Sequence, residues 1–526
     1  MVRAVRDVLR VPGVRRVEVG WGFSLTSEQA GTVTLVAYSY ASGGAGLVAA
    51  YIAASTLAGM CVMLCLAGVT GRVRREVLLR RVTAVRAMLL GLAALTAALR
   101  GSPLAVIALA VAGASLVKTY RPLQSSMLPW LVRTPADLAS ANVVAAVLEN
   151  SGALCGPLLA GVLLAVGPAW IPMACAAAFV GLATLSLRHL VVPQLPAQVT
   201  RGPGQVAHDA ASGLTGLARI APPAGVAVLV FAQTFVRGAL IVLIAVLAVK
   251  TLALGASAVG WLNTAIGAGG VAGAVVAAVV VRVTRLGRSF IAGLLLWGLP
   301  LAVLALTLTP ASAYLALIVV GLGNALEDAG VFTLVLRLAS PRIGGKVVAA
   351  KEFTALAGLG AGSVAAPWFL YGLGVRGTLV MLGGALAVLA LVHARRFARL
   401  DRAMPAPGEE AELLRKLAMF APGTVVMREG EPGDQFHVIV DGSALVSVRG
   451  RPRPPLARGD PLGEIALLRN VPRTATIVAA EPLRTLSLDQ EMFLFAVTGN
   501  SDSSAAADTL VAQRLSADYV AEPERP

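Results

Sequence analysis

Long apolar segments separated by short basic loops constrain the fold of this chain more than any other feature. A membrane-spanning helix needs about 20 mostly apolar residues, and roughly twelve segments of that kind follow one another before residue 393. They cover residues 14–40, 45–69, 82–99, 103–125, 138–166, 169–187, 223–249, 257–281, 289–308, 311–338, 346–371 and 377–392. Only 14% of the residues are charged, against about 25% in soluble proteins. The sequence therefore predicts a mainly α-helical, multi-pass membrane protein.

The positions of arginine and lysine predict which side of the membrane each loop faces, because basic residues gather in cytoplasmic loops. Basic groups occur at the N-terminus and after every second apolar segment, whereas the alternate loops hold at most one basic residue each, such as Arg100, Lys250 or Arg376. Both termini are expected to be cytoplasmic, and the expected location is the plasma membrane. Membrane topology explains the net charge of +16, so no nucleic-acid partner is expected.

A long connection rich in proline, glutamine and glycine, residues 188–222, divides the twelve segments into six and six. Such internal symmetry is typical of transporters built from repeats. The stretch Gly152-Ala153-Leu154-Cys155-Gly156-Pro157-Leu158-Leu159-Ala160-Gly161 resembles the glycine-proline motif of the major facilitator superfamily, which is common among its exporters. The resemblance covers residues 10–397 and implies two six-helix pseudo-repeats. Ordinary tight helix packing is the alternative explanation of the motif.

Ionisable and amide side chains within apolar segments are costly to place in a bilayer, so they indicate either function or ion pairing. The candidates are Glu28, Glu149, Asn150, Gln233, Arg237, Asn324, Glu327 and Asp328. In the resembled superfamily the first, fourth, seventh and tenth helices line the transport cavity. We expect Glu28, Glu327 or Asp328 to carry a coupling proton or to face a cationic group, with Arg237 as the countercharge. A static ion-pair lock between the halves is the alternative.

A second kind of site is predicted near the end of the chain, in the contiguous stretch Gly463-Glu464-Ile465-Ala466-Leu467-Leu468-Arg469-Asn470-Val471-Pro472-Arg473-Thr474-Ala475-Thr476. It joins a glycine-led helical turn to a strand through a Pro-Arg corner. Backbone N–H groups, one carboxylate and one guanidinium can therefore converge on a small anion. A sugar phosphate has the matching chemistry. The alternative is a surface β-roll in which the arginine and the glutamate are simply solvated.

The same stretch resembles the phosphate-binding cassette of cyclic nucleotide-binding domains. The candidate nucleotide site comprises Gly463, Glu464, Ile465, Ala466, Arg473, Thr474 and Ala475. The resemblance implies that Glu464 binds the ribose 2′-hydroxyl and Arg473 the cyclic phosphate, while Gly463, Ala466 and Ala475 lend backbone groups. Threonine at position 474 occurs in binders of both nucleotides, so cAMP or cGMP is expected as a regulatory ligand.

The residues around this cassette predict a small β-roll with flanking helices. Short β-rich runs at 425–427, 436–440, 444–448 and 477–488 are separated by Gly-containing turns. An amphipathic helix is expected at 409–419, and a helix at 505–515 resembles the lid that closes over the base in that family. The expected organisation is 1–190 for the N-terminal transmembrane half, 191–222 for the connecting loop, 223–397 for the C-terminal half, 398–408 for a linker, 409–516 for the nucleotide-binding domain and 517–526 for a tail.

Together these features predict a secondary active transporter, a small-molecule exporter driven by an ion gradient, whose cytoplasmic domain binds a cyclic nucleotide. A membrane-embedded nucleotide sensor that signals to a partner without moving a solute is the alternative. An enzyme is not expected, because the sequence holds no nucleophile-base constellation. The four cysteines lie in apolar segments without metal-site spacing, so no metal is expected. The expected partners are the lipid bilayer, a small-molecule substrate and the nucleotide.

Overall fold

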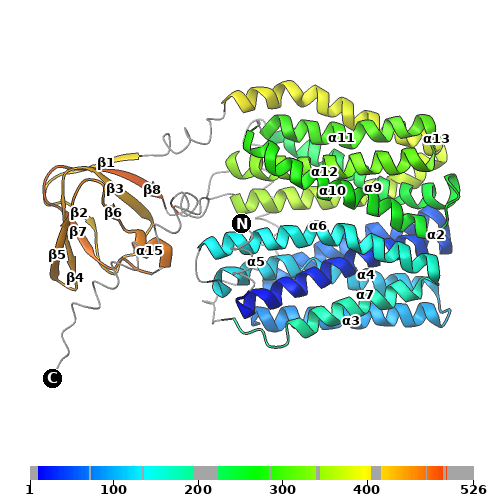
Figure 1. Cartoon of the computed structure of the whole chain (residues 1–526), viewed down its shortest axis with the longest axis horizontal. Helices are drawn as coiled ribbons and strands as arrows, with labels where there is room; N and C mark the ends of the chain where they lie inside the picture. The colour runs from blue at the N-terminus through cyan, green and yellow to red at the C-terminus, as the bar shows by residue number, and fades with distance from the viewer. Residues whose placement is uncertain are drawn as a thin grey trace. The chain divides into compact units, whose positions relative to one another are not determined.

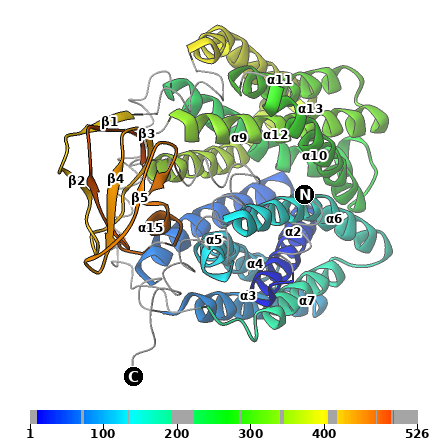
Figure 2. The same ribbon diagram turned by 60° about the vertical axis from the view of Figure 1, so that its left-hand side comes forward.

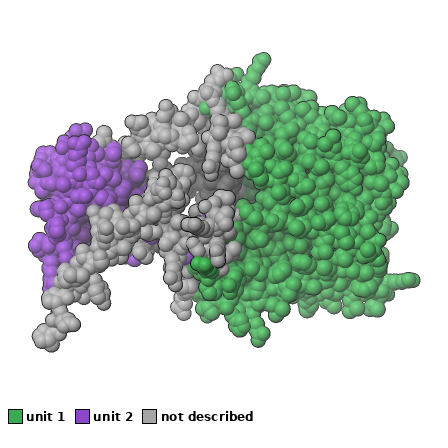
Figure 3. Space-filling view, in the orientation of Figure 1, with its two compact units in different colours: residues 1–131, 141–403 green, residues 132–140, 404–526 purple. Residues whose placement is uncertain are grey.

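The computed structural model describes residues 10–69, 73–132, 135–192, 223–283, 286–338, 344–403, 416–469, 471–489 and 493. The chain forms two compact units (Figure 3). One contains residues 1–131 and 141–403, and the other contains residues 132–140 and 404–526. The first unit holds the long apolar helices, and the second holds the strands.

The first unit consists of helices that run side by side (Figure 1). In chain order they are α2 (Pro12–Val69), α3 (Arg75–Ala98), α4 (Pro103–Val117), α5 (Tyr120–Leu131), α6 (Pro135–Val166), α7 (Trp170–Ser186), α9 (Pro223–Val246), the π-helical turn η1 (Leu247–Thr251), α10 (Ser257–Val283), α11 (Leu286–Thr307), α12 (Pro310–Leu338) and α13 (Gly344–Ala403). Two of them, α2 and α13, each bend sharply at glycine. Gly44 and Gly374 have φ of +65°, a conformation that glycine adopts without strain.

Within the described residues these helices form twelve spans, six in each half. α2 and α13 contribute two spans each, and α4 and α5 together make one. Among the residues that the structure describes, eight helical segments are long and apolar enough to cross a membrane, two of them being the bent pairs. The other two spans are α3, which carries charged residues along its length, and α7, which has 17 residues. The predicted twelve-helix fold is confirmed.

The glycine-proline motif lies in α6, where it packs closely against helices from both halves. A Cβ atom on Gly156 would lie 2.9 Å from the carbonyl oxygen of Thr26 in α2. One on Gly161 would lie 3.3 Å from the backbone nitrogen of Trp261 in α10. Such close approach of backbones is what small residues permit between membrane helices. Tight packing is therefore present at the motif, and its connection with export stays a prediction.

The second unit is a β-roll with a short helix at one end (Figure 2). Its elements are β1 (Lys416–Phe420), β2 (Val425–Met427), β3 (Gln435–Asp441), β4 (Ala444–Val448), β5 (Arg451–Leu456), β6 (Pro461–Leu462), α15 (Glu464–Arg469), β7 (Thr476–Ala479) and β8 (Leu483–Asp489). The strand order is β1-β8-β3-β6 in one sheet and β2-β7-β4-β5 in the other. Side chains such as Met427, Ile439 and Leu462 fill the core between the sheets. The predicted β-roll is confirmed, whereas β5 and β6 were not predicted.

The predicted helix at 409–419 is wrong for the part that the structure describes. Residues 416–420 form β1, which pairs with β8 from Lys416 opposite Ser487 to Phe420 opposite Leu483. Pairing with a distant strand satisfies the backbone and outweighs the local helix preference of this segment. Residues 409–415 and the predicted lid at 505–515 lie outside the described residues. At the other boundary, α13 continues to Ala403, beyond the predicted end of the C-terminal half at residue 397.

Candidate functional site

The predicted cassette folds as a glycine turn, the helix α15, an irregular corner and strand β7. Gly463 has φ of +82°, the left-handed conformation that favours glycine, and it turns the chain from β6 directly into α15. After α15, the backbone N–H of Arg473 donates to the carbonyl oxygen of Glu431 at 2.8 Å. The carbonyl oxygen of Arg473 accepts from the N–H of Gly430, also at 2.8 Å. The corner is therefore fixed on the turn between β2 and β3.

The guanidinium of Arg473 is fixed as well, with a side chain only 6% exposed. Nη1 donates to the Gly463 carbonyl oxygen at 3.2 Å, and Nη2 donates to the Gln435 carbonyl oxygen at 2.6 Å. The exposed carboxylate of Asp434 lies 3.8 Å from Nη2. Burial lowers the pKa of Arg473, and the negative charge of Asp434 opposes that shift. Because a guanidinium carries five N–H donors, the group keeps donors for an anion after binding these two carbonyl groups.

A cavity of about 280 Å³ lies between the cassette and strands β4 and β5. All seven residues predicted from the cassette line it: Gly463, Glu464, Ile465, Ala466, Arg473, Thr474 and Ala475. The Glu464 carboxylate belongs to a residue that is 2% exposed. Met427, Val446 and Leu456 add an apolar wall. The cavity is close to the lower end of the usual size of small-molecule sites, about 300 Å³. It combines a cation, a carboxylate and an apolar surface.

Strand β5 adds a part of the cavity wall that the sequence did not predict. Arg453 and Pro454 line the cavity from this strand. The segment has three prolines in six residues, and proline argues against a central strand. Because β5 is an edge strand, its prolines are tolerated. The signal in the sequence is Gly450, because a two-residue hairpin turn needs positive φ, and the structure shows positive φ at both Arg449 and Gly450.

A buried histidine lies next to the cassette in β3. His437 is 4% exposed, and its Nδ1 lies 3.0 Å from Oγ1 of Thr485 in β8. Burial, together with the positive charge of Arg473, lowers the pKa of His437 to about 4. The imidazole is therefore neutral at neutral pH. His437 therefore adds no positive charge beside the guanidinium of Arg473.

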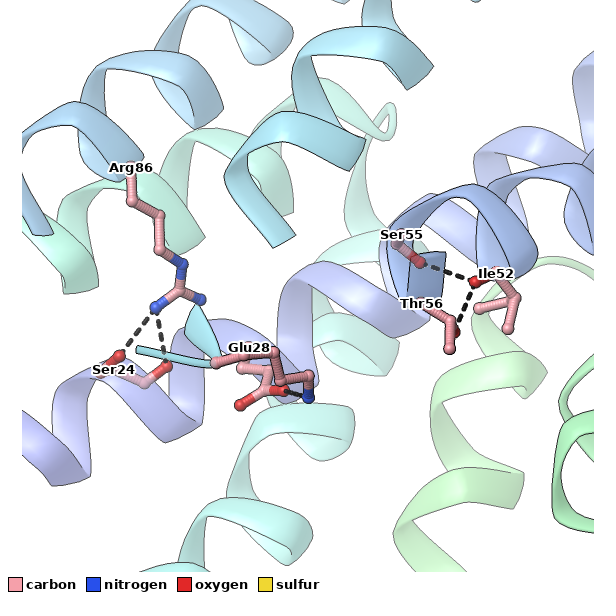
Figure 4. A network of polar contacts seen from close by, with 7 residues as sticks. Ser24, Glu28, Ile52, Ser55, Thr56 and Arg86 are labelled. Atoms are coloured by element: carbon pink, nitrogen blue, oxygen red, sulfur yellow. Dashed lines mark hydrogen bonds and ion pairs between the residues drawn. The ribbon is translucent and has the colours of Figure 1, made fainter. Parts of the chain in front are cut away.

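In the membrane unit, the first predicted residue forms an ion pair within the N-terminal half. Oε1 of Glu28 in α2 lies 3.0 Å from Nζ of Lys118, at the break between α4 and α5. One helical turn away, Oγ of Ser24 accepts a 2.7 Å hydrogen bond from Nη1 of the buried Arg86 in α3 (Figure 4). Lys118 and Arg86 were not among the site residues predicted from the sequence. Their positions inside apolar segments were the signal that could have found them.

The two predicted residues of the fifth span, Glu149 and Asn150, make different kinds of contact. Oε1 of Glu149 in α6 lies 3.5 Å from Nε of Arg121 in α5. Nδ2 of Asn150 donates instead to the carbonyl oxygen of Ala146 in its own helix, at 2.9 Å. Of the two residues, Glu149 is therefore the one that forms an ion pair with another span in the described part of the chain.

The C-terminal half holds the remaining predicted residues. In α9, Gln233 is buried and Arg237 is exposed. In α12, Nδ2 of Asn324 donates to Oδ2 of the exposed Asp328 at 2.9 Å, and the neighbouring Glu327 is 3% exposed. One carboxylate of this adjacent pair is therefore accessible, and the other is packed inside the helical unit.

Electrostatic interactions connect the candidates of the two halves. Arg237 interacts with Glu28 of the N-terminal half and with Glu327 and Asp328 of its own half. Asp328 also interacts with Glu149. The structure thus brings the predicted charges of α2, α6, α9 and α12 near one another. The close ion pairs of Glu28 and Glu149, however, lie within the N-terminal half and not between the halves.

Comparison with known proteins agrees with the geometry of the roll. Residues 418–499 match the family model of the cyclic nucleotide-binding domain. The β-roll is a cyclic nucleotide-binding domain. The cGMP-dependent protein kinases of Eimeria tenella and Toxoplasma gondii are each 42% identical to this chain over 81 residues. These matches cover 15% of this chain and 8% of each kinase, so the chain spans less than a tenth of those relatives.

The helical unit is similar to solved transporters. A crystal structure of a mutant of the peptide transporter POT aligns with a TM-score of 0.59 at 16% identity, covering 75% of this chain and 96% of that one. The same transporter in complex with sulfate aligns with a TM-score of 0.58 at 16% identity, covering 74% of this chain and 95% of that one. Identity at this level shows the fold alone, which is the major facilitator fold. The chain therefore combines a transporter fold with a cyclic nucleotide-binding domain, as the sequence predicted.

Proposed function

We propose that this protein is a secondary active transporter whose activity is regulated by a cyclic nucleotide bound in its C-terminal domain. The observation that carries the proposal is the cavity lined by all seven cassette residues, in the same chain as a transporter fold. A ligand shifts a transport equilibrium only by binding its states with different affinities. The nucleotide must therefore favour one state of the helical unit over the other.

In the proposed complex, Arg473 donates charge-assisted hydrogen bonds to the cyclic phosphate, and Glu464 accepts one from the ribose 2′-hydroxyl. The two carbonyl contacts of Arg473 support this role, because they hold the guanidinium at the cavity before a ligand arrives. The apolar wall from β4 and β5 then receives the base. Both cAMP and cGMP carry these groups, and both are proposed ligands.

We also propose that the charged residues between the halves form the transport site. A carboxylate inside a membrane protein needs a cation, a wet environment or a proton. Glu327 is buried, and no salt bridge to it occurs in the described part of the chain. It is the proposed carrier of a coupling proton. The accessible Asp328 then faces a cationic group of the substrate, and Arg237 supplies the countercharge.

The proposed direction is export, out of a cell whose plasma membrane holds the protein with both termini in the cytoplasm. Two features of the sequence support this. The glycine-proline motif in α6 resembles one that is common among exporters of the superfamily. The basic loops alternate with loops that hold at most one basic residue, as expected when basic loops face the cytoplasm.

Flux in proteoliposomes tests the proposal. A panel of fluorescent cationic and zwitterionic dyes is followed across an imposed proton gradient, without nucleotide and with saturating cAMP or cGMP. One nucleotide is expected to change the flux of wild type and of Arg458→Ala, whose side chain is exposed outside the cavity. Arg473→Ala should abolish that change. If calorimetry detects binding of the nucleotides to the full chain but neither nucleotide changes the flux, the proposed regulation is wrong. The proposed transport activity is then still supported.

A membrane-embedded nucleotide sensor without transport is the second candidate. The pairs Glu28–Lys118 and Glu149–Arg121 favour it, because each neutralises a charge within one half and stabilises a fixed bundle. Nucleotide binding without movement of any dye in either direction supports the sensor. Movement of one dye that is driven by the proton gradient excludes a sensor without transport.

A further inference from the structure

The last helix of the membrane unit extends beyond its apolar part. The apolar run ends near residue 392, yet α13 continues to Ala403. His393, Phe397 and Asp401 follow at four-residue spacing, so they share one face of the extension. Phe397 is 1% exposed and Asp401 is 6% exposed, whereas the arginines at 395, 396 and 399 are exposed. The extension is therefore packed along one face against the helical unit.

Asp401 makes two direct hydrogen bonds to another helix. Its Oδ1 accepts from the backbone N–H of Gly287 at 2.7 Å, and its Oδ2 accepts from the backbone N–H of Arg288 at 3.0 Å. Both donors belong to the first turn of α11, where N–H groups have no acceptor within their own helix. A negative charge is also favoured at a helix start. Asp401 therefore caps α11 from a helix more than 100 residues further along the chain.

The packing around this cap is close. The rings of Phe397 and Phe290 lie 5.4 Å apart, which joins α13 to α11 one turn from the hydrogen bonds. A Cβ atom on Gly287 would lie 2.8 Å from the carbonyl oxygen of Phe397. The cap and these contacts therefore hold the end of α13 against the start of α11.

The helix α11 connects this cap to the charged residues in α12. Gly293 lies in α11 shortly after Gly287, and a Cβ atom on it would lie 2.6 Å from the backbone nitrogen of Glu327. The backbones of α11 and α12 are thus in direct contact at the buried carboxylate. One continuous helix therefore joins the first turn of α11 to the backbone contact at Glu327.

We propose that Asp401 is the positioning residue through which nucleotide binding acts on the transport site. The nucleotide-binding domain follows α13 in the chain, with β1 beginning at Lys416. A pull or rotation applied to the end of α13 acts on Gly287 and Arg288 through the Asp401 carboxylate, and α11 carries it to Glu327. This inference rests on the proposed function, because it requires a nucleotide in the cavity.

Hydrogen exchange on the full chain in lipid nanodiscs tests the proposal without a known substrate. Exchange is followed by mass spectrometry without nucleotide and with saturating cAMP or cGMP. In wild type, the nucleotide should slow exchange in the cassette and also change exchange in the peptide that contains Gly287 and Arg288. In Asp401→Ala, the cassette should respond as in wild type while the α11 peptide no longer responds. Arg399→Ala, on the exposed face of the same extension, should behave like wild type.

A cassette response without an α11 response in wild type overturns the inference and leaves the nucleotide site intact. A full α11 response in Asp401→Ala overturns it as well. If neither peptide responds and calorimetry detects no binding, the proposed function and the inference fail together. Should Asp401→Ala not fold, Asp401→Asn keeps the shape and one acceptor oxygen, and the α11 response should then be reduced but present. An undiminished response in this variant also overturns the inference.

Discussion

The nucleotide cavity and the intramembrane charged site both gather charged side chains, but the chain specifies them in different ways. The seven cassette residues lie within positions 463–476, and a local turn and a short helix aim them into one cavity. In the membrane, Glu149 and Asp328 are 179 residues apart and interact only because helix packing brings them near each other. In a contiguous segment, the local backbone determines where each side chain points. In a dispersed site, the packing of many other residues determines it.

The consequence appears in the partners of the predicted residues. In the cassette, backbone carbonyl groups position Arg473, and the carboxylate that lies 3.8 Å from it, Asp434, is exposed to solvent. In the membrane, Lys118 and Arg121 neutralise Glu28 and Glu149, and neither cation was among the predicted site residues.

Removal of the cassette arginine is expected to have the largest effect. Arg473→Ala deletes a buried cation, and truncating one partner of such a charged contact costs about 2–5 kcal/mol. The dissociation constant for cyclic nucleotide should therefore rise on the order of 30-fold or more. Titration calorimetry on the full chain measures this change. Arg458→Ala is the matched control and should leave the dissociation constant within about twofold, because its side chain is exposed away from the cavity. An equal loss in both variants would show that the contiguous motif does not determine binding.

Acidification should lower the free energy of unfolding of the nucleotide-binding domain, because His437 is buried in its neutral form. The folded-state pKa is lowered to about 4, whereas the unfolded chain has a value near the ordinary 6.5. As the pH falls below 6.5, the unfolded chain binds a proton that the folded domain excludes, so the free energy of unfolding decreases until the pH reaches about 4. Within that window, each pH unit lowers the free energy of unfolding by about 1.4 kcal/mol. The total decrease between pH 7.5 and pH 5 is about 2 kcal/mol.

Hydrogen exchange of β3 and β8 amides, corrected for intrinsic rates, measures this pH dependence. His437→Gln should remove that part of it, because the imidazole is the group that titrates. Carboxylates elsewhere in the domain titrate equally in both proteins and cancel in the difference. An unchanged pH dependence in His437→Gln would contradict the account.

The same difference between local and dispersed information explains what the sequence could predict. The twelve spans and five of the strands followed from hydropathy and alternation, which are local patterns. β1 was predicted as a helix because its partner β8 lies far along the chain. The cap that Asp401 places on α11 joins residues 114 positions apart, and no local sequence pattern predicts such a contact. The cavity wall from β5 was not predicted for a further reason. The segment is rich in proline, and proline argues against a strand.

The pair of Glu28 and Lys118 should contribute a smaller free energy. Their side chains are 22% and 38% exposed, so solvent screens the pair and a coupling of about 1 kcal/mol is expected. Glu28→Gln and Lys118→Met should each lower the melting temperature in detergent, and the double variant should lose less than the sum of the two. Proton-driven flux separates the roles. A static pair predicts that the double variant keeps its flux, whereas a coupling carboxylate predicts that both variants carrying Glu28→Gln lose it.

The smallest effect is expected for Asn150. Its amide donates to the Ala146 carbonyl group of its own helix at 2.9 Å, while the adjacent Glu149 pairs with Arg121 of another span. Neighbouring residues on a helix point about 100° apart, so the two side chains need not share a role. Asn150→Ala should change stability by about 0.5 kcal/mol or less and flux by no more than about twofold. Glu149→Gln should have the larger effect, because it leaves Arg121 without its carboxylate. If Asn150→Ala lowered flux further than Glu149→Gln, substrate contact would lie on the Asn150 side of α6, and the charges between the halves would not define the transport site.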